Sequence, residues 1–411
     1  MDIIQTNKKL LLLSFVSLLS IPLSLASEKP IFAWTFFGPD SSVGVRATTS
    51  GTTCPKLTVD SQTIQMKARP SAPNVQFPIL VCEAEISSKA KEIQVDGESV
   101  PAPNLNPKKI VILGDTGCVI KQVKDKARVQ ACNDPDKWPF AQVALSAANW
   151  KPDLVIHVGD YHYRERSCPD QDLRCKGAIS GDQWDSWEQD FFGPASPLLK
   201  AAPWILARGN HELCSRAGEG WFRLLEPRES PEKCSDERDP YRLKLDGFSL
   251  WVIDSASDHN IQNNLIQVSK LLQTGEWLLL HRPFLTPGVA KTVPSLPEAM
   301  SGAGKIGVVM AGHKHLLSIN QFSDSRPPEL ITGNGGTQLA KVKGESTRPF
   351  KSDDGKVNSL TFVDFGFATM EARGNSWIYS ARDKMGKEIF QCNFKQEKDQ
   401  KTILLCNSDG L

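Results

Sequence analysis

Residues 154–163 read LVIHVGDYHY, a run of five mostly apolar residues followed directly by a polar cluster. The run has the length and composition of a strand that is buried on both faces of a sheet. Gly159 permits a sharp backbone turn where a side chain would crowd the cluster. A single Gly-Asp pair is usually only a turn or a helix cap. The segment therefore decides the fold only if its pattern occurs repeatedly along the chain.

The pattern of a short apolar run followed by a polar cluster occurs five times after residue 107. The runs lie at residues 110–113, 154–158, 204–206, 277–280 and 306–310. The clusters that follow them are, in order, Gly114-Asp115-Thr116-Gly117, Gly159-Asp160-Tyr161-His162-Tyr163, Gly209-Asn210-His211-Glu212, His281-Arg282-Pro283 and Gly312-His313-Lys314-His315. Helical spacing lies between some of the runs, at residues 138–149 and 262–272. We therefore predict an α/β layered domain whose ligand site lies beyond the carboxyl ends of its strands.

Taken together, the five clusters resemble the motifs of the calcineurin-like metallophosphoesterases, which run Asp, Gly-Asp, Gly-Asn-His-Glu/Asp, His and Gly-His-x-His. The resemblance covers residues 107–340 of the chain. Within this superfamily the purple acid phosphatases are most similar, because Tyr163 follows Asp160 in their Gly-Asp-x-x-Tyr form. Gly117 agrees, since it stands where the wider superfamily commonly has a histidine. The resemblance implies an α/β fold, a four-layer αββα metallophosphoesterase sandwich with a smaller N-terminal β-sandwich domain.

The resemblance also implies a site with two metal ions. One ion would be held by Asp115, Tyr163 and His315, the second by Asn210, His281 and His313, and Asp160 would bridge them. Carboxylate and phenolate oxygens suit Fe(III), whereas two imidazoles and an amide suit Zn(II), Mn(II) or Fe(II). Two such ions activate water as hydroxide for in-line attack on phosphorus. If Tyr163 only packs, the site is instead that of an ordinary Mn or Zn phosphoesterase.

Two histidines outside the ligand set are candidate catalytic residues. His211 occupies the position that, in the family, stabilises charge on the phosphate or protonates the leaving group. His162 lies between Asp160 and Tyr163, and we expect it either to assist or to have a supporting or solvent-facing role. Purple acid phosphatases generally have a further histidine before Gly-His-x-His, but residues 282–312 contain none. The sequence therefore leaves the leaving-group proton donor open.

The N-terminal part of the chain predicts an exported protein with two domains. Lys8 and Lys9 precede an apolar stretch that ends at a small-residue cleavage site after Ala26, as in a signal peptide of residues 1–26. The alternative is an uncleaved membrane anchor. Residues 29–106 contain short β-type runs, such as 31–37 and 63–67, and predict a β-sandwich domain. The metallophosphoesterase catalytic domain is predicted for residues 107–411.

Ten cysteines follow the predicted signal peptide, and this even number favours disulfides in an exported protein. Spacing alone cannot fix the connectivity, and one hypothesis is pairing of sequence neighbours: Cys54–Cys82, Cys118–Cys132, Cys168–Cys175, Cys214–Cys234 and Cys392–Cys406. A zinc cluster is the alternative, although no closely spaced pair supports it. The formal net charge of +1 gives no indication of a nucleic-acid coat or a polybasic membrane-surface protein.

These observations predict a secreted or periplasmic, acid phosphatase-like hydrolase that acts on small-molecule phosphate monoesters with two metal ions as cofactors. A phosphodiesterase with the same two-metal site is one alternative. A noncatalytic envelope binding module with a relict metal site is another, and it is less favoured because all seven ligand positions are filled. We expect no membrane span after signal cleavage, and the sequence identifies no protein partner.

Overall fold

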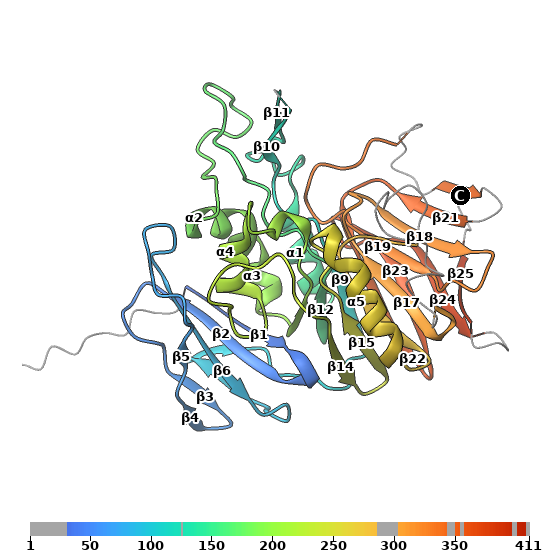
Figure 1. Cartoon of the computed structure of the whole chain (residues 1–411), viewed down its shortest axis with the longest axis horizontal. Coiled ribbons are helices and arrows are strands. Elements are labelled where there is room, and N and C mark those ends of the chain that lie inside the picture. The colour runs from blue at the N-terminus through green and yellow to red at the C-terminus, as the bar shows by residue number, and fades with distance from the viewer. Residues whose placement is uncertain are drawn as a thin grey trace, which may run out of the picture.

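The computed structural model describes residues 31–124, 126–285, 303–342, 350–353, 357–396 and 401–407. The predicted signal peptide lies outside these residues. Within them, two large sheets face each other and helices cover their outer faces (Figure 1). No helix in the described part of the chain combines the length and the apolar character needed to cross a membrane.

The larger sheet has eleven strands drawn from the N-terminal, central and C-terminal parts of the chain. In spatial order it contains β25 (Thr402–Asn407), β24 (Glu388–Gln396), β23 (Ser376–Asp383), β22 (Gly366–Arg373), β9 (Lys109–Leu113), β12 (Leu154–His157), β13 (Trp204–Leu206), β1 (Phe32–Phe37), β2 (Val43–Thr49), β6 (Leu80–Ile86) and β5 (Lys67–Ala68). The central strands β9, β12, β13 and β1 are parallel, and pairing beyond them is antiparallel on both sides.

The smaller of the two facing sheets has eight strands. In spatial order it contains β14 (Tyr241–Leu245), β15 (Phe248–Val252), β16 (Glu276–Leu279), β17 (Ile306–Ala311), β19 (Glu329–Thr332), β18 (Leu317–Phe322), β21 (Val357–Phe362) and β20 (Phe350–Asp353). The strands β15, β16, β17 and β19 are parallel. All five strands predicted from the apolar runs are therefore present, three in the larger sheet and two in the smaller one.

Helices form the two outer layers. On the larger sheet pack α1 (Phe140–Asn149) and α3 (Gly193–Leu199), with the short helices α2 (Trp184–Trp187) and α4 (Gly218–Gly220) beside them. On the smaller sheet packs α5 (Asp258–Leu271), whose apolar face carries Ile261, Leu265 and Val268. The helices predicted from periodicity at residues 138–149 and 262–272 correspond to α1 and α5.

The strand β9 shows why four layers form. Its residues Ile110 and Ile112 belong to the core between the two sheets, whereas Val111 and Leu113 belong to the core under the helices of the larger sheet. Successive side chains of a strand point to opposite faces, so a continuous apolar run is buried on both sides. The αββα fold class is thereby confirmed.

The predicted N-terminal β-sandwich is present, but one of its two sheets continues the catalytic sheet through the pairing of Phe36 with Trp204. Its second sheet contains β4 (Gln62–Ile64), β3 (Leu57–Val59), β7 (Ile93–Val95) and β8 (Glu98–Val100). The single strand expected at residues 63–67 is wrong, because the chain crosses from one sheet to the other between β4 and β5. Folding of residues 29–106 as an independent domain stays a prediction.

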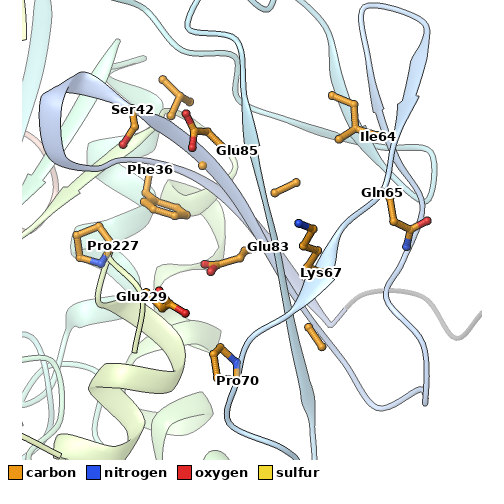
Figure 2. Close-up of a pocket in the computed structure, with 14 residues that line it drawn as sticks. Phe36, Ser42, Ile64, Gln65, Lys67, Pro70, Glu83, Glu85, Pro227 and Glu229 are labelled. Atoms are coloured by element: carbon orange, nitrogen blue, oxygen red, sulfur yellow. The ribbon is translucent and has the colours of Figure 1, made fainter. Parts of the chain in front are cut away.

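Two buried arginines fasten the N-terminal strands to the catalytic region. Arg46 donates to two backbone carbonyl oxygens of residues 222–230 at 2.7 and 3.0 Å, and Arg69 donates to two others at 2.9 and 3.0 Å. Both also form ion pairs with Glu83 of β6. Glu83 lines a surface cavity of about 580 Å³ between these strands and the segment that carries Pro227 and Glu229 (Figure 2). The N-terminal strands and the catalytic region therefore share polar as well as apolar contacts.

All ten cysteines are paired, and the pairs are the predicted sequence neighbours. Cys392 lies opposite Cys406 and links the edge strands β24 and β25. The alternative of a zinc cluster built from cysteines is therefore wrong. Five disulfides indicate an oxidising, extracellular-type compartment.

Candidate metal centre

The five polar clusters meet where the carboxyl ends of strands from both sheets come together. From the larger sheet come Asp115 after β9, Asp160 and Tyr163 after β12, and Asn210 after β13; from the smaller sheet come His281 after β16, and His313 and His315 after β17. Side chains separated by up to two hundred residues in sequence are thereby in contact. All seven predicted ligands belong to this one cluster.

Oxygen donors form one side of the cluster. The Tyr163 hydroxyl lies 3.0 Å from Asp115 Oδ1 and 2.7 Å from Asp160 Oδ2, and all three side chains are buried. Burial raises the pKa of Tyr163 well above its usual value, and the two carboxylates add to the effect. Burial likewise raises the pKa of Asp115. Three buried acidic groups in contact form a donor set that fits a highly charged cation.

Imidazole nitrogens face this oxygen group from the smaller sheet. His281 Nε2 lies 3.2 Å from Asp160 Oδ2, 3.1 Å from Asn210 Oδ1 and 3.3 Å from His313 Nδ1. The other ring nitrogen of His281 donates to the carbonyl of Val158 at 2.9 Å, which orients Nε2 inward. Asp160 outweighs burial and raises the pKa of His281 to about 9. One ligand atom each of Asp160, His281 and His313 lies within 4.8 Å of the others, as a bound cation requires.

His315 completes the oxygen-rich side of the cluster. Its Nε2 lies 3.1 Å from the Tyr163 hydroxyl and 3.5 Å from Asp115 Oδ1. Its Nδ1 donates to the backbone carbonyl of Gln338 at 2.7 Å, the same arrangement that orients His281. The candidate ligands therefore form an oxygen-rich group and an imidazole-rich group, and Asp160 contacts both. Occupation by two metal ions stays a prediction.

The backbone around the cluster is strained. Asp115, Asp160 and His313 have positive φ values of 53°, 61° and 68°. Such conformations are costly for residues other than glycine and persist at functional sites where the surrounding structure imposes them. Gly159 has φ 98°, and a Cβ atom there would lie 2.7 Å from His281 Nδ1. Glycine at this position therefore gives the strand end room to approach the histidine.

Glu212 holds the loop that carries the Asp160 carboxylate, a role that the sequence analysis missed. Its Oε1 accepts from the backbone N–H groups of Tyr161 and His162 at 2.8 and 3.2 Å. Its Oε2 accepts from those of Asp160 and Gly209 at 3.1 and 3.0 Å. Burial and the nearby Asp160 raise the pKa of Glu212 to about 7. The signal for this role was its place as the last residue of the Gly-Asn-His-Glu motif.

Asp190 plays a similar part for Tyr163. Its Oδ2 accepts from the Tyr163 backbone N–H at 2.7 Å, and its Oδ1 accepts from the Cys118 N–H and from Arg164 Nε, both at 2.8 Å. The carboxylate is buried and paired with the guanidinium of Arg164. It lies in the helical segment Glu188–Phe192, away from the five clusters in sequence, so no pattern indicated this contact.

His211, the first predicted catalytic residue, lies against the cluster. Its ring centroid is 3.6 Å from that of Tyr163, and its backbone N–H donates to Asp160 Oδ1 at 2.8 Å. Its Nδ1 lies 2.7 Å from Glu165 Oε1, and Arg216 Nη2 lies 2.7 Å from its Nε2. Burial lowers the pKa of His211 to about 4. The ring is therefore held in place on the side of the site formed by the larger sheet.

The ring of His162, the second predicted catalytic residue, contacts residues outside the candidate ligand set. Its Nε2 lies 2.6 Å from Ser186 Oγ, and its ring centroid lies 5.4 Å from that of Trp187. Burial lowers its pKa. Among the described residues, no hydrogen bond joins its side chain to the seven candidate ligands. These contacts favour the supporting role that the sequence left open.

Comparisons with known proteins agree with this geometry. Residues 108–317, slightly more than half of the chain, match the family model of the calcineurin-like phosphoesterases. A purple acid phosphatase isolated from yellow lupin (Lupinus luteus) seeds has a similar structure, with a TM-score of 0.55, 16% sequence identity, and coverage of 88% of this chain and 73% of that chain. At this identity the likeness shows the fold alone.

A second solved structure is GAP50, the anchor in the inner membrane complex of Plasmodium, with a TM-score of 0.42 and 11% identity over 72% of this chain and 91% of that chain. No curated protein sequence matches the chain significantly. The family model spans the described strands β9, β12, β13, β16 and β17 and every candidate ligand. The chain therefore belongs to the calcineurin-like phosphoesterase family.

Proposed function

We propose that the protein is a purple acid phosphatase-like hydrolase of phosphate monoesters that requires two metal ions. One observation carries the proposal. Seven donor side chains, from five strand ends in two sheets, lie in mutual contact and form two groups that share Asp160. We assign Asp115, Tyr163 and His315 to an Fe(III) site, and Asn210, His281 and His313 to Zn(II), Mn(II) or Fe(II).

The chemistry supplied by two bound ions is neutralisation of the phosphate oxygens and activation of water for in-line attack on phosphorus. The chain's own residues fix the geometry. The carbonyl groups that accept from His281 and His315 set which ring nitrogens face inward. Glu212 holds the Asp160 loop, so the bridging carboxylate keeps its position as charge develops. His211 lies where it can contact the phosphate group, with its Nδ1 paired to Glu165.

Hydrolysis of a monoester and a diester by the metal-reconstituted protein tests the reaction class. We expect a higher kcat/KM for 4-nitrophenyl phosphate than for bis(4-nitrophenyl) phosphate. Preference for the bis-ester would instead identify a phosphodiesterase with the same site. A metal-loaded protein that cleaves neither compound would contradict the enzymatic proposal and favour a binding module.

The visible spectrum tests the identity of the oxygen-rich site. Tyrosinate bound to Fe(III) gives a charge-transfer band, so the iron-loaded protein is expected to be purple and the Tyr163→Phe variant colourless. An iron-loaded wild type without the band would contradict the assignment of Tyr163. We further propose that the protein acts outside the cytoplasm, secreted or periplasmic, because its five disulfides are stable in an oxidising compartment.

A further inference from the structure

A lysine on the hairpin formed by β10 (Ile120–Val123) and β11 (Lys126–Val129) faces the candidate metal centre. The Lys121 ammonium lies 3.4 Å from His211 Nε2 and 5.5 Å from the centroid of the Tyr163 ring. The side chain is partly buried. Lys121 was not among the residues that the motifs indicated, because it lies between the first and second clusters in sequence.

The ammonium of Lys121 is close to carboxylates but is not neutralised by one. Glu165, one of the carboxylates that act on Lys121, is already bound to Arg216 and to His211 Nδ1. Among the described residues, no carboxylate forms an ion pair with Lys121. Charged groups that are partly buried normally have a partner of opposite sign. An anion in the site would supply that partner.

Two cationic side chains lie against the ring of His211. Arg216 Nη2 lies 2.9 Å from Nδ1 and 2.7 Å from Nε2, and Lys121 Nζ lies 3.4 Å from Nε2. The Glu165 carboxylate lies 2.7 Å from Nδ1, and the Asp160 carboxylate lies 4.0 Å from Nε2. Arg216 is paired with Glu165, whereas Lys121 forms no ion pair with a carboxylate in the part of the chain that the structure describes.

The hairpin itself carries an electrostatic cost that an anion would offset. Lys121 lies directly opposite Arg128 in the β10–β11 register, so the two side chains share one face. Like charges in this position destabilise a strand pair. Arg128 Nε donates to Gln338 Oε1 at 2.7 Å, and the Gln338 carbonyl accepts from His315. Arg128 is thereby connected through Gln338 to the candidate ligand His315.

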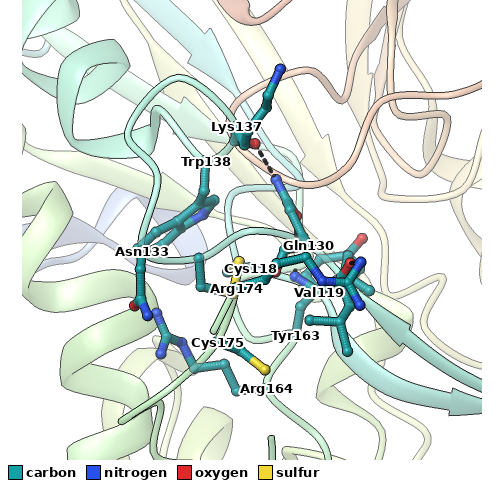
Figure 3. Close-up of a disulfide and its surroundings, with 12 residues drawn as sticks. Cys118, Val119, Gln130, Asn133, Lys137, Trp138, Tyr163, Arg164, Arg174 and Cys175 are labelled. Atoms are coloured by element: carbon teal, nitrogen blue, oxygen red, sulfur yellow. Dashed lines mark hydrogen bonds between the residues drawn. A yellow bond between two sulfur atoms is a disulfide. The ribbon is translucent and has the colours of Figure 1, made fainter. Parts of the chain in front are cut away.

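The base of the hairpin is fixed relative to the ligand loop. The disulfide Cys118–Cys132 closes the base of the hairpin (Figure 3). It lies next to the paired residues Ile120 and Val129, and these side chains form a buried cluster. The Ile120 N–H donates to the carbonyl of Tyr163 at 3.1 Å. The position of the residue after Ile120 is thus tied to the position of a candidate metal ligand.

We propose that Lys121 is a substrate-binding residue whose ammonium binds an oxygen of the phosphate group beside His211. The proposal rests on the proposed phosphatase function, and it adds a cation to a site that lacks the further histidine of the purple acid phosphatases. The ligand chemistry is that of a phosphate group, whether in an ester or as the free ion.

Binding of inorganic phosphate to the metal-loaded full chain tests the proposal independently of turnover. Isothermal titration calorimetry on Lys121→Gln should show affinity weakened about tenfold or more, since one charge-assisted hydrogen bond is lost. Lys121→Arg should stay within about threefold of the wild type, because it keeps the charge. In the 4-nitrophenyl phosphate assay, the loss in Lys121→Gln should fall on KM and on inhibition by phosphate.

Lys126→Gln is the matched control, because it removes the same charge from an exposed position nearer the hairpin tip. An equal loss in Lys126→Gln would overturn the proposal in favour of long-range electrostatic attraction. Unchanged phosphate affinity in Lys121→Gln, or no phosphate binding by the wild type, would overturn it as well. A wild type that binds phosphate through Lys121 without hydrolysing esters would leave the proposal standing and contradict the proposed enzymatic function. Metal content, measured on every variant, must equal that of the wild type.

Discussion

The two halves of the candidate metal centre differ in both chemistry and origin. The larger sheet supplies the oxygen donors Asp115, Asp160, Tyr163 and Asn210, whereas the smaller sheet supplies the imidazoles His281, His313 and His315. Neither half contains a complete ligand set for either proposed ion, because His315 faces the oxygen group and Asn210 faces His281. The packing of the two sheets against each other, rather than any one motif, therefore forms the site.

Changing Asp160, which joins the two proposed ligand groups, should have the largest effect. In Asp160→Asn the carboxylate that contacts Tyr163 and His281 becomes an amide, so both proposed metal ions would lose a charged ligand. We expect kcat/KM for 4-nitrophenyl phosphate to fall by about a thousandfold or more, equivalent to roughly 4 kcal/mol of transition-state stabilisation. Elemental analysis should show loss of metal. Retention of both metals and of activity would contradict the shared role of Asp160.

A change on the imidazole side should separate the two halves. His313→Ala removes a contact of His281 but none of the oxygen group, so we expect one metal ion per chain to remain and the tyrosinate band to persist. Activity should fall by about a hundredfold, because one ion of a two-ion site is lost. The matching change on the oxygen side, Tyr163→Phe, should remove the tyrosinate band. If His313→Ala also abolished the band, the division into two sites would be wrong.

Glu212→Gln, a change next to the oxygen donors, should lower the stability of the protein. Glu212→Gln places an amide N–H₂ group where two backbone N–H donors now point, so these donors lose their acceptor. We expect the free energy of unfolding, measured by urea denaturation of the metal-free protein, to fall by about 2–4 kcal/mol. Unchanged stability would mean that the loop keeps its shape without this carboxylate.

Glu83→Gln changes a residue outside both halves of the site, and it should have the smallest effect on activity. Burial raises the pKa of Glu83, but Arg46 and Arg69 outweigh it and hold that pKa below its usual value. A lowered folded-state pKa contributes stability above the unfolded-state pKa, and this contribution is lost as the pH falls through the folded-state value. Glu83→Gln should therefore lower the free energy of unfolding by about 1–3 kcal/mol at neutral pH.

The same comparison repeated at acidic pH should show a smaller difference between Glu83→Gln and the wild type, because the stabilising charge of the wild-type carboxylate is lost as the pH falls through its lowered folded-state pKa. The kcat/KM of Glu83→Gln at neutral pH should equal that of the wild type. A gap in stability that is independent of pH would show that the side chain acts through packing instead of charge.

The sequence predicted the parts of the site that depend on local pattern. Apolar runs such as residues 110–113 became strands buried on both faces, and the ligands that follow them lie at strand ends as expected. The seven candidate ligands named by the family motifs lie in one cluster, and their binding of metal stays a prediction. The distribution of the five strands over two sheets followed only from the family resemblance, since strand periodicity carries no information about which strands pair.

Supporting contacts could not be predicted, because they join segments that are distant in sequence and have no pattern of their own. Lys121 meets His211 across ninety positions, and Glu212 meets the backbone of residues 160–162 across about fifty. The strand expected at residues 63–67 was wrong for a related reason. A continuous β-type composition does not reveal where the chain leaves one sheet for another.

The central position of β9 has a consequence for the order of folding. On one side β9 pairs with β12, but on the other its residue Ile112 lies opposite Ala368 of β22. During synthesis, which starts at the N-terminus, this strand has one unpaired edge until the C-terminal strands are available. Unpaired edges promote aggregation. Such long-range pairing also makes folding slow. We therefore expect the strand that leads into Asp115 to acquire its protection from hydrogen exchange only late in folding.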